Sequence, residues 1–414
     1  MTKIVNVLTD IHSARLSNVV PQAQICKLLM KGMATALAVK SGKIAQKDVE
    51  KIRKRVELKF SQFAVPASDI KQRYMCLLLE NYDAALERHS MFENGKYVND
   101  DITFPIYDNL IKNHTHPEGL ALSGRMELYR QHAEKHIRNL YKDIIEKPDH
   151  IIHVTSTGYF DPNPVDTIIA EKEWYDVDVT NFYHRACNAP ISAIRMANAV
   201  LTASSSSCCE LPKKRIDLVH SELFSAHITL TDDHPSNVVI MSSFSDSFLR
   251  YSIRTHNDIC NTGIGGLKIL AFKNMTIPDS SSVVVWKVSE PAFHFTIDPI
   301  KYSKHIKKNL KEFIYTFFRD NGMDFMLIKD KILFVIQAST AYVLKQMAKE
   351  LKLADEQIAF SKNILYENGY LSSGAIPFMC KQIIDNRDIP SGKIVFCIGY
   401  AQGITLSGML LEKL

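Results

Sequence analysis

The predicted fold depends on the segment Thr180-Asn181-Phe182-Tyr183-His184-Arg185-Ala186-Cys187-Asn188-Ala189-Pro190-Ile191. An apolar run at 151–156 precedes it and is typical of a strand, and the apolar run at 191–201 predicts a buried helix. Cys187 therefore lies where a helix begins, and there the free backbone N–H groups and the helix dipole favour a thiolate. Because the thiolate is the nucleophilic form, a covalent acyl-cysteine enzyme would have its nucleophile at such a position. A lone cysteine is more often a small buried hydrophobic residue, and the position alone favours that interpretation.

The composition is that of a globular protein. The chain has 414 residues, of which 46% are hydrophobic and 23% charged, so we expect a sizeable core and two or three structural units. The net charge of +5 is spread along the chain and does not favour nucleic acid as a partner. No apolar run is long enough for a membrane span or a signal peptide. Eight irregularly spaced cysteines fit a reducing compartment, so we predict a cytoplasmic protein.

Strand and helix patterns alternate twice along the chain. The glycine-rich turn at 261–266 lacks the strand and helix that flank a dinucleotide-binding motif, so we interpret it as a linker between two halves, 1–265 and 266–414. Strand patterns lie at 4–8, 151–156, 216–224, 248–253, 267–275, 283–288, 332–336 and within 393–411. Helical patterns lie at 22–38, 46–58, 76–86, 125–146, 191–201, 237–244, 302–318, 342–351 and 372–384. We therefore predict a layered α/β fold, with a long loop at 91–123 as a possible lid.

Two surface patterns suggest binding sites, but each has a simpler interpretation. His132 and His136 are four residues apart on a predicted helix, a spacing that can place two imidazoles on one metal. No third ligand accompanies them in the sequence, so we expect a solvated helix face and no metal site. Lysines recur along the helix at 302–318 and would suit an acidic protein partner, although a solvated helix face is the expectation there as well.

Six short motifs, in the same order along the chain, resemble the type III polyketide synthases (the chalcone synthase family). The resemblance extends from about residue 60 to the C-terminus. The motifs are Ile70-Lys71-Gln72-Arg73-Tyr74-Met75, the strand–Cys187–helix junction, Phe244-Ser245-Asp246-Ser247, Pro278-Asp279-Ser280, Glu367-Asn368-Gly369-Tyr370-Leu371-Ser372-Ser373-Gly374-Ala375 and the closing turn Gly399-Tyr400-Ala401-Gln402-Gly403-Ile404-Thr405-Leu406.

The resemblance implies a thiolase-type fold with five α-β-α-β-α layers built from two similar halves, normally as a homodimer. It also implies that the cysteine takes up an acyl starter from a thioester. A histidine and an asparagine then bind the carbonyl of a malonyl extender and stabilise the enolate that forms when carbon dioxide leaves. Two donors directed at one developing oxyanion suit that step. The implied substrates are acyl-CoA or acyl-carrier-protein thioesters, and no bound cofactor is expected.

The sequence departs from the family pattern at both donors. The family histidine position holds Gln337 and the asparagine position holds Tyr370, so we expect Cys187, Gln337 and Tyr370 to form the catalytic site. Both side chains still donate hydrogen bonds, but they are neutral, and a lost charge-assisted bond to an oxyanion costs roughly 1.5–3 kcal/mol. The glycine that normally precedes the nucleophile is Ala186. Decarboxylative extension is therefore expected to be impaired, while acylation of Cys187 is expected to survive.

The residues that would bind the thioester carrier also differ from the family pattern. Lys71 matches a basic residue that the family uses near the coenzyme A phosphates, and Gly399 and Gly403 belong to the closing glycine turn. The positions just before Lys71 lack further basic residues, since they hold Ala64, Pro66 and Ala67. A carrier protein is thus as well supported as free coenzyme A.

Several functions agree with these residues. The first is a condensing enzyme that joins the acyl group on Cys187 to a second acyl substrate. The second is an acyltransferase that passes the acyl group to an amine or alcohol, which the loss of the two family donors favours. The third is a pseudo-enzyme subunit that supports an active paralogue in a heterodimer. An accidental resemblance is the fourth interpretation.

Overall fold

The computed structural model describes residues 5–16, 18–43, 45–78, 92–93, 96–97, 104–108, 110, 115–205, 211–260, 262–337 and 339–414. In this part of the chain, one mixed sheet has nine strands in the order β13-β14-β15-β10-β1-β9-β8-β6-β7. Its strands are β1 (Asn6–Ser13), β6 (His150–Thr155), β7 (Asp178–Tyr183), β8 (Arg215–Glu222), β9 (Ser247–Thr255), β10 (Gly266–Thr276), β13 (Leu333–Ile336), β14 (Ile394–Ala401) and β15 (Thr405–Lys413).

The sheet repeats one arrangement of strands twice. In the first half β6 is parallel to β8, which is antiparallel to β9, which is antiparallel to β1. In the second half β13 is likewise parallel to β14, which is antiparallel to β15, which is antiparallel to β10. The two sets meet where β1 pairs antiparallel with β10, with Leu8 opposite Leu267. The sheet thus consists of two similar halves, and β10 begins next to the predicted boundary at 265/266.

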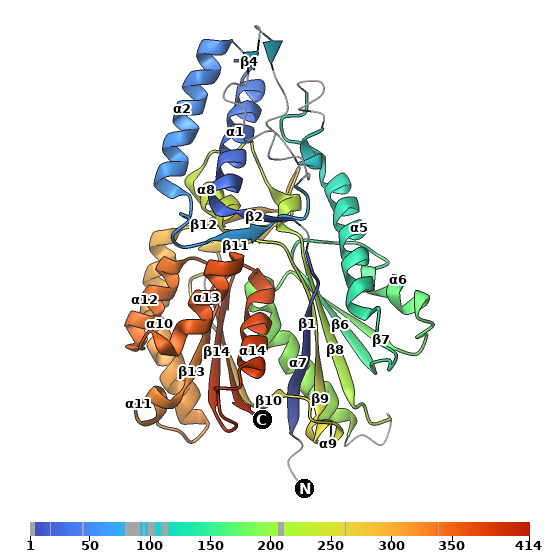
Figure 1. Cartoon of the computed structure of the whole chain (residues 1–414). Coiled ribbons are helices and arrows are strands. Elements are labelled where there is room, and N and C mark those ends of the chain that lie inside the picture. Colours follow the sequence, from blue (N-terminus) through green and yellow to red (C-terminus); the bar gives the residue numbers. More distant parts are fainter. Residues whose placement is uncertain are drawn as a thin grey trace.

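Helices cover the sheet in three layers (Figure 1). On the outer side of the first half lie α5 (Leu122–Tyr141) and α6 (Pro164–Glu171), and on that of the second lie α10 (Pro299–Asp320) and α12 (Ala341–Leu351). Between the halves lie α7 (Ala189–Ser204) and α14 (Ala375–Asp385), whose apolar side chains share one core with strands of both halves. The layers are therefore α-β-α-β-α, the thiolase-type arrangement expected from the sequence.

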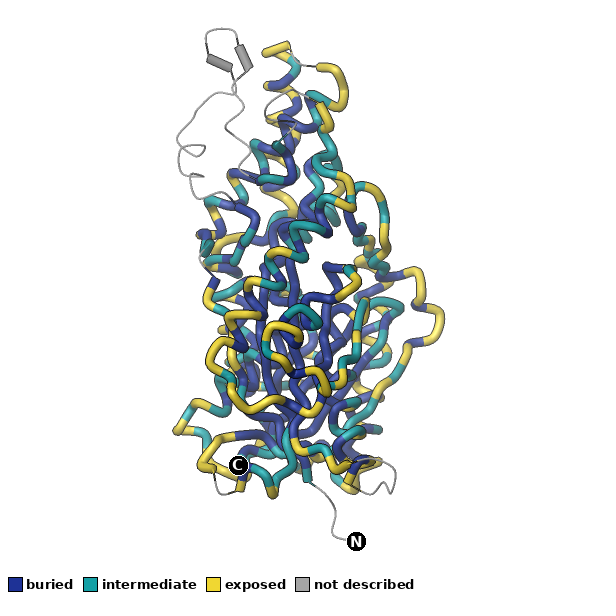
Figure 2. Tube along the Cα trace, turned by 90° about the vertical axis from the view of Figure 1, so that its right-hand side faces the viewer, coloured by how far each residue is buried: buried dark blue, intermediate teal, exposed yellow. Residues whose placement is uncertain are grey.

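The helices α1 (Gln22–Lys40) and α2 (Gln46–Phe63) pack against each other at the end of the molecule opposite the C-terminus (Figure 1). Buried residues are concentrated around the sheet, and exposed ones on the peripheral helices and loops (Figure 2). The remaining elements are the strands β2 (Val19–Pro21), β3 (Gln72–Tyr74), β4 (Phe92–Glu93), β5 (Lys96–Tyr97), β11 (Val284–Lys287) and β12 (His294–Ile297), and the helices α8 (Pro235–Ser243), α9 (His256–Ile259), α11 (Phe325–Ile328) and α13 (Ala359–Asn368). Across the described residues, none of the helices combines the length and the apolar character that a membrane span requires.

Some predictions about individual elements are wrong. The predicted strand at 151–156 is β6, but it does not lead directly into Cys187, because α6 and β7 lie between them. The strand β7 was missed in the sequence: it lies at the sheet edge, is only half-buried and so lacks a continuous apolar run. Residues 72–74 form strand β3, which pairs with β2. The predicted helix at 76–86 lies largely outside the described residues, as does much of the predicted lid at 91–123, so both remain predictions.

The helix α5 also differs from its prediction, because it directs two histidines inward. His136 is 6% exposed and its ring packs on that of Phe248 in β9, with the centroids 4.5 Å apart. The ring of His132 lies 6.1 Å from that of His136, and its side chain is half-buried. The expected solvated face is therefore wrong for these two residues.

Candidate active site

Cys187 lies in a short 3-10 turn, Ala186–Asn188, between β7 and α7. Ala186 adopts the left-handed region with φ of 46°, and its N–H donates to Ser156 Oγ at 2.8 Å, which fixes the turn. The Cys187 sulfur lies 3.4 Å from Ser372 Oγ, in the matching turn Ser372–Gly374 that begins α14. The predicted nucleophile therefore lies at the start of a helix, where the two halves of the fold meet.

The Cys187 thiol is in its protonated form at neutral pH. Burial raises its pKa to about 11, and hydrogen bonds with Ser372 and Tyr370 offset only part of that increase. The carboxyl group of Glu222 acts in the same direction as burial, and none of the largest contributions from the described residues comes from a cationic side chain. The expectation that this position would favour a thiolate is therefore wrong, because burial removes the thiolate from water and is the largest cause of the raised pKa.

This raised pKa predicts a steep pH dependence for Cys187 chemistry. With a pKa of about 11, roughly one thiol in 10,000 is ionised at pH 7, and that fraction rises about tenfold per unit up to pH 10. We expect the rate of alkylation of Cys187 by iodoacetamide, followed by peptide mass spectrometry, to rise by the same factor. The exposed Cys260 in the same digest controls for the reagent. A rate at Cys187 that levels off below pH 9 would show that another group stabilises the thiolate.

Gln337 and Tyr370, the other two predicted catalytic residues, lie beside Cys187. The Gln337 amide follows β13 and donates to Tyr370 Oη and to the Ser372 carbonyl, both at 3.1 Å. Because the Tyr370 hydroxyl accepts that bond, its own proton is directed to the Cys187 sulfur, with which it is hydrogen-bonded. The structure thus brings the three residues together as a chain of donors that ends at the thiol.

Asn188 is a member of this site that the sequence does not single out. Its Oδ1 and the Oε1 of Gln337 are buried, and neither has a hydrogen-bond partner among the described residues. Both face Gly399 in β14, where a Cβ would lie 2.7 Å from Asn188 Oδ1 and 3.3 Å from Gln337 Oε1. Gly399 is therefore required for this close approach. Buried polar atoms normally have a partner, so these two unpartnered carbonyl oxygens are a departure from the usual pattern.

Cys187 lines an apolar cavity of about 420 Å³. Its walls come from α8, β12, α10 and α12, with Tyr302, Tyr370 and Tyr400 at the same end as the thiol. Its apolar lining includes Val239, Ile240, Phe244, Val284, Phe295, Ile297, Ile306, Val343 and Met347. The lining and volume suit an acyl chain with part of its thioester arm.

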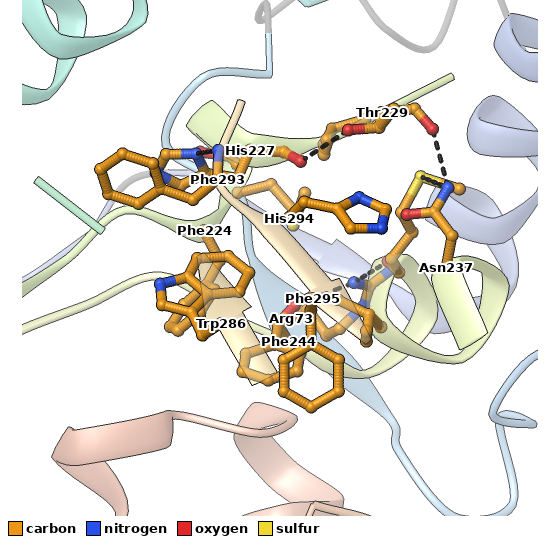
Figure 3. Close-up of a pocket in the computed structure, with 15 residues that line it drawn as sticks. Arg73, Phe224, His227, Thr229, Asn237, Phe244, Trp286, Phe293, His294 and Phe295 are labelled. Carbon is orange, nitrogen blue, oxygen red and sulfur yellow. Dashed lines mark hydrogen bonds between the residues drawn. The ribbon is translucent and has the colours of Figure 1, made fainter. Parts of the chain in front are cut away.

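On the far side of Phe244 the space is filled by aromatic side chains (Figure 3). The rings of Phe244 and Phe224 lie 4.3 Å apart, and those of His227 and Phe293 are stacked at 4.5 Å. Trp286 lies between these pairs and donates to the Ser156 carbonyl at 2.7 Å. A cavity of only about 30 Å³ remains there. Of these two cavities, the larger one has the room for an acyl group on Cys187.

A buried acid lies behind the site, although the sequence patterns did not single it out. Glu222 is fully buried at the end of β8 and accepts bonds from Ser373 Oγ at 2.6 Å, Thr157 Oγ1 at 3.1 Å and the Ser156 N–H at 3.1 Å. Burial raises its pKa to about 7. No local signal distinguishes Glu222, because β8 also holds the charged residues Arg215 and Asp217.

The structure places the other predicted residues away from the thiol. Lys71 pairs with Glu367 at 2.9 Å and is not among the described residues that line the cavity. Gly403 has φ of +64° in the turn between β14 and β15 and donates its N–H to the Val284 carbonyl at 3.1 Å. A role in binding the carrier remains a prediction for Lys71, Gly399 and Gly403.

The comparisons with known proteins agree on one family of folds. Residues 268–414 match the family model of chalcone and stilbene synthases, C-terminal domain. The whole chain superposes on PKS-I from the brown alga Ectocarpus siliculosus with a TM-score of 0.75 and 16% identity, covering 100% of both chains. It also superposes on the C-terminal type III polyketide synthase domain of Steely1, a type I/III hybrid from Dictyostelium, with a TM-score of 0.68 and 17% identity, covering 99% of each. The fold is that of the type III polyketide synthases.

The type III polyketide synthase resemblance predicted from the motifs is therefore confirmed. The family model supports it by sequence in the second half of the chain, and the solved structures support it by fold over the whole chain. No curated protein sequence shows a significant match to the chain.

Proposed function

We propose that this protein is a condensing enzyme of the type III polyketide synthase kind that carries an acyl group on Cys187. The observation that carries the proposal is the position of Cys187, which lines a large apolar cavity and is hydrogen-bonded to the Tyr370 hydroxyl that Gln337 holds. The match of residues 268–414 to chalcone and stilbene synthases supports the reaction class. The proposed substrates are acyl-CoA or acyl-carrier-protein thioesters, handled by a homodimer.

In the first step the Cys187 sulfur attacks the carbonyl carbon of the acyl thioester. The carbonyl oxygen becomes an oxyanion, and the Tyr370 hydroxyl, held by Gln337, donates to it. The carbon–sulfur bond to the carrier then breaks, and the carrier thiol leaves with the proton that Cys187 lost. The products are acyl-Cys187 and a free carrier thiol.

In the second step a malonyl thioester binds in the same cavity. Loss of carbon dioxide gives an enolate, whose carbon attacks the carbonyl of acyl-Cys187 and releases the cysteine thiolate. Both N–H groups of the Gln337 amide are used to hold Tyr370 and the Ser372 carbonyl, so the donor to the enolate oxygen is the Tyr370 hydroxyl. This hydroxyl is neutral and stabilises the enolate oxygen less than a charged donor would. The filled space behind Phe244 leaves little room for a growing chain, so we expect short products.

A bulkier residue in the wall of the cavity is expected to change the accepted acyl length. Val343 lines the cavity from α12, and Val343→Phe fills part of the space that a longer chain needs. We expect kcat/KM to fall at least about tenfold for long acyl thioesters and to stay close to wild type for acetyl thioester. Lys345→Phe, on the exposed face of the same helix, is the matched control. Equal effects on both chain lengths would show that the acyl chain lies elsewhere.

The condensation itself is tested with carbon-13-labelled malonyl thioester and an unlabelled acyl thioester. We expect a product with one acyl unit and at least one labelled two-carbon unit, detected by liquid chromatography and mass spectrometry and absent with Cys187→Ala. Loading of Cys187 without any such product would overturn the condensing step. It would instead support transfer of the acyl group to an amine or alcohol.

One observation favours the pseudo-enzyme subunit as a second candidate. The thiol pKa of about 11 leaves little thiolate at neutral pH, and none of the largest contributions to it from the described residues comes from a cationic side chain. A subunit that only supports an active paralogue would not need a reactive thiol. In that case Cys187→Ala would leave the activity of the reconstituted heterodimer unchanged.

A further inference from the structure

Three side chains that can bind a metal ion gather between α5 and the segment after β3, apart from the site at Cys187. Cys76, His132 and His136 each offer one ligand atom, and these three atoms lie within 4.8 Å of one another. The histidines are one helical turn apart on α5, and the cysteine comes from a segment more than fifty residues earlier. The fold thus supplies the third ligand that the sequence alone does not reveal.

The two imidazoles have unused ligand capacity inside the protein. The Nδ1 atoms of His132 and His136 are both buried, and neither has a hydrogen-bond partner among the described residues. His136 is 6% exposed. Buried polar atoms normally have a partner, so two unpartnered ring nitrogens next to a thiol indicate a missing ligand rather than a solvated face.

We propose that Cys76, His132 and His136 form a site for a divalent transition-metal ion, with Zn²⁺ as the ion it suits. One thiolate and two imidazoles are borderline-soft ligands of the kind that zinc prefers, and a tetrahedral ion needs its ligand atoms about 3.3–3.8 Å apart. Binding releases the Cys76 proton to solvent and forms one sulfur–metal and two nitrogen–metal bonds. A water molecule completes the coordination.

The surroundings of the site hold the cysteine in place. The Cys76 N–H donates to Asp246 Oδ2 at 2.6 Å, and the other oxygen of this buried carboxyl accepts the Ser225 N–H at 2.9 Å. The positive charge of Lys135 lies near all three ligand side chains and lowers the pKa of each. A dication bound here would offset the negative charges of the thiolate and Asp246. It would also tie α5 to the segment that connects to β3, and so stabilise the first half of the fold.

The test is a titration of the metal-free full-length protein with Co²⁺, followed by displacement with Zn²⁺. We expect one equivalent of Co²⁺ to bind, with visible d–d bands and a near-ultraviolet thiolate-to-cobalt absorption. Cys76→Ser should remove that absorption, and His132→Gln or His136→Gln should weaken binding at least about tenfold. Cys260→Ser and His305→Gln, at an exposed cysteine and a half-buried helical histidine, should match wild type.

A second measurement uses only the wild-type protein, in case the variants do not fold. One equivalent of Zn²⁺ should protect Cys76 from iodoacetamide while Cys260 is still alkylated, and should raise the melting temperature. The proposal is overturned if wild type binds no stoichiometric metal. It is also overturned if the thiolate absorption persists in Cys76→Ser, or if Zn²⁺ leaves the alkylation of Cys76 unchanged.

Discussion

Tyr370→Phe is expected to slow acylation of Cys187 by about 100- to 1,000-fold, because it removes a donor from the oxyanion that forms during acyl transfer. The Tyr370 hydroxyl receives a bond from Gln337 and is hydrogen-bonded to the Cys187 sulfur. The substitution removes one oxygen and keeps the ring, which packs on Phe244 at 4.8 Å. We therefore expect the fold and the cavity to be retained, so that the loss reflects chemistry.

The matched control for this variant is Tyr400→Phe. Tyr400 lines the same cavity, but its hydroxyl accepts the Ser339 N–H at 3.1 Å. We expect its acylation rate to remain within a few-fold of wild type. Both rates are measured by single-turnover mass spectrometry with one acyl thioester. Equal rates for Tyr370→Phe and wild type would show that the Tyr370 hydroxyl does not act in the transition state.

Asp217→Ala is expected to lower the free energy of unfolding by about 3–5 kcal/mol, because it leaves two buried arginines without their shared partner. Asp217 is fully buried in β8 and accepts from Arg215 Nε at 2.8 Å and from Ser252 Oγ at 2.7 Å. Arg250 Nη1 lies 3.5 Å from the same carboxyl, and Arg215 and Arg250 are 5% and 1% exposed. Arg250 keeps its ion pair with Asp10 at 2.9 Å, but water cannot replace the lost carboxylate beside the buried Arg215, so the loss of stability should be large.

Urea denaturation measures this loss of stability. Glu171→Ala is the control, because Glu171 forms an exposed ion pair with Arg138 at 2.6 Å. Removing that pair should change the free energy of unfolding by less than about 1 kcal/mol, since water and salt screen exposed charges. Similar effects of the two substitutions would contradict a structural role for the buried pairs of Asp217.

The fold could be predicted from the sequence where apolar periodicity is strong. The pattern in α10, with Ile306, Leu310 and Phe317 on one face, specifies a helix against the second half of the sheet. Edge strand β7 has no such pattern, because none of its side chains is fully buried and the partly buried ones do not alternate with exposed ones. The pairing of β1 with β10 could not be read from the sequence, since it depends on contacts between residues about 260 positions apart.

The residues of the site that belong to sequence motifs could be predicted. The junction at Cys187 and the substitutions at Gln337 and Tyr370 could be located from the sequence, and the structure places all three together. The thiol pKa could not be predicted, because it depends on burial among segments distant in sequence. Two other features also join segments that are distant in sequence, so no local pattern predicts them. They are the close approach of Asn188 to Gly399 and the proximity of Cys76 to His132.

The most direct test of the central claim is intact-protein mass spectrometry after incubation with acyl-CoA and acyl-carrier-protein thioesters. Wild type is compared with Cys187→Ala and with Cys380→Ala, which removes a different buried cysteine. We predict a mass increase of one acyl group in wild type and Cys380→Ala, and none in Cys187→Ala. No acylation of wild type by any donor, or equal acylation of Cys187→Ala, would contradict the assignment of Cys187 as the residue that carries the acyl group.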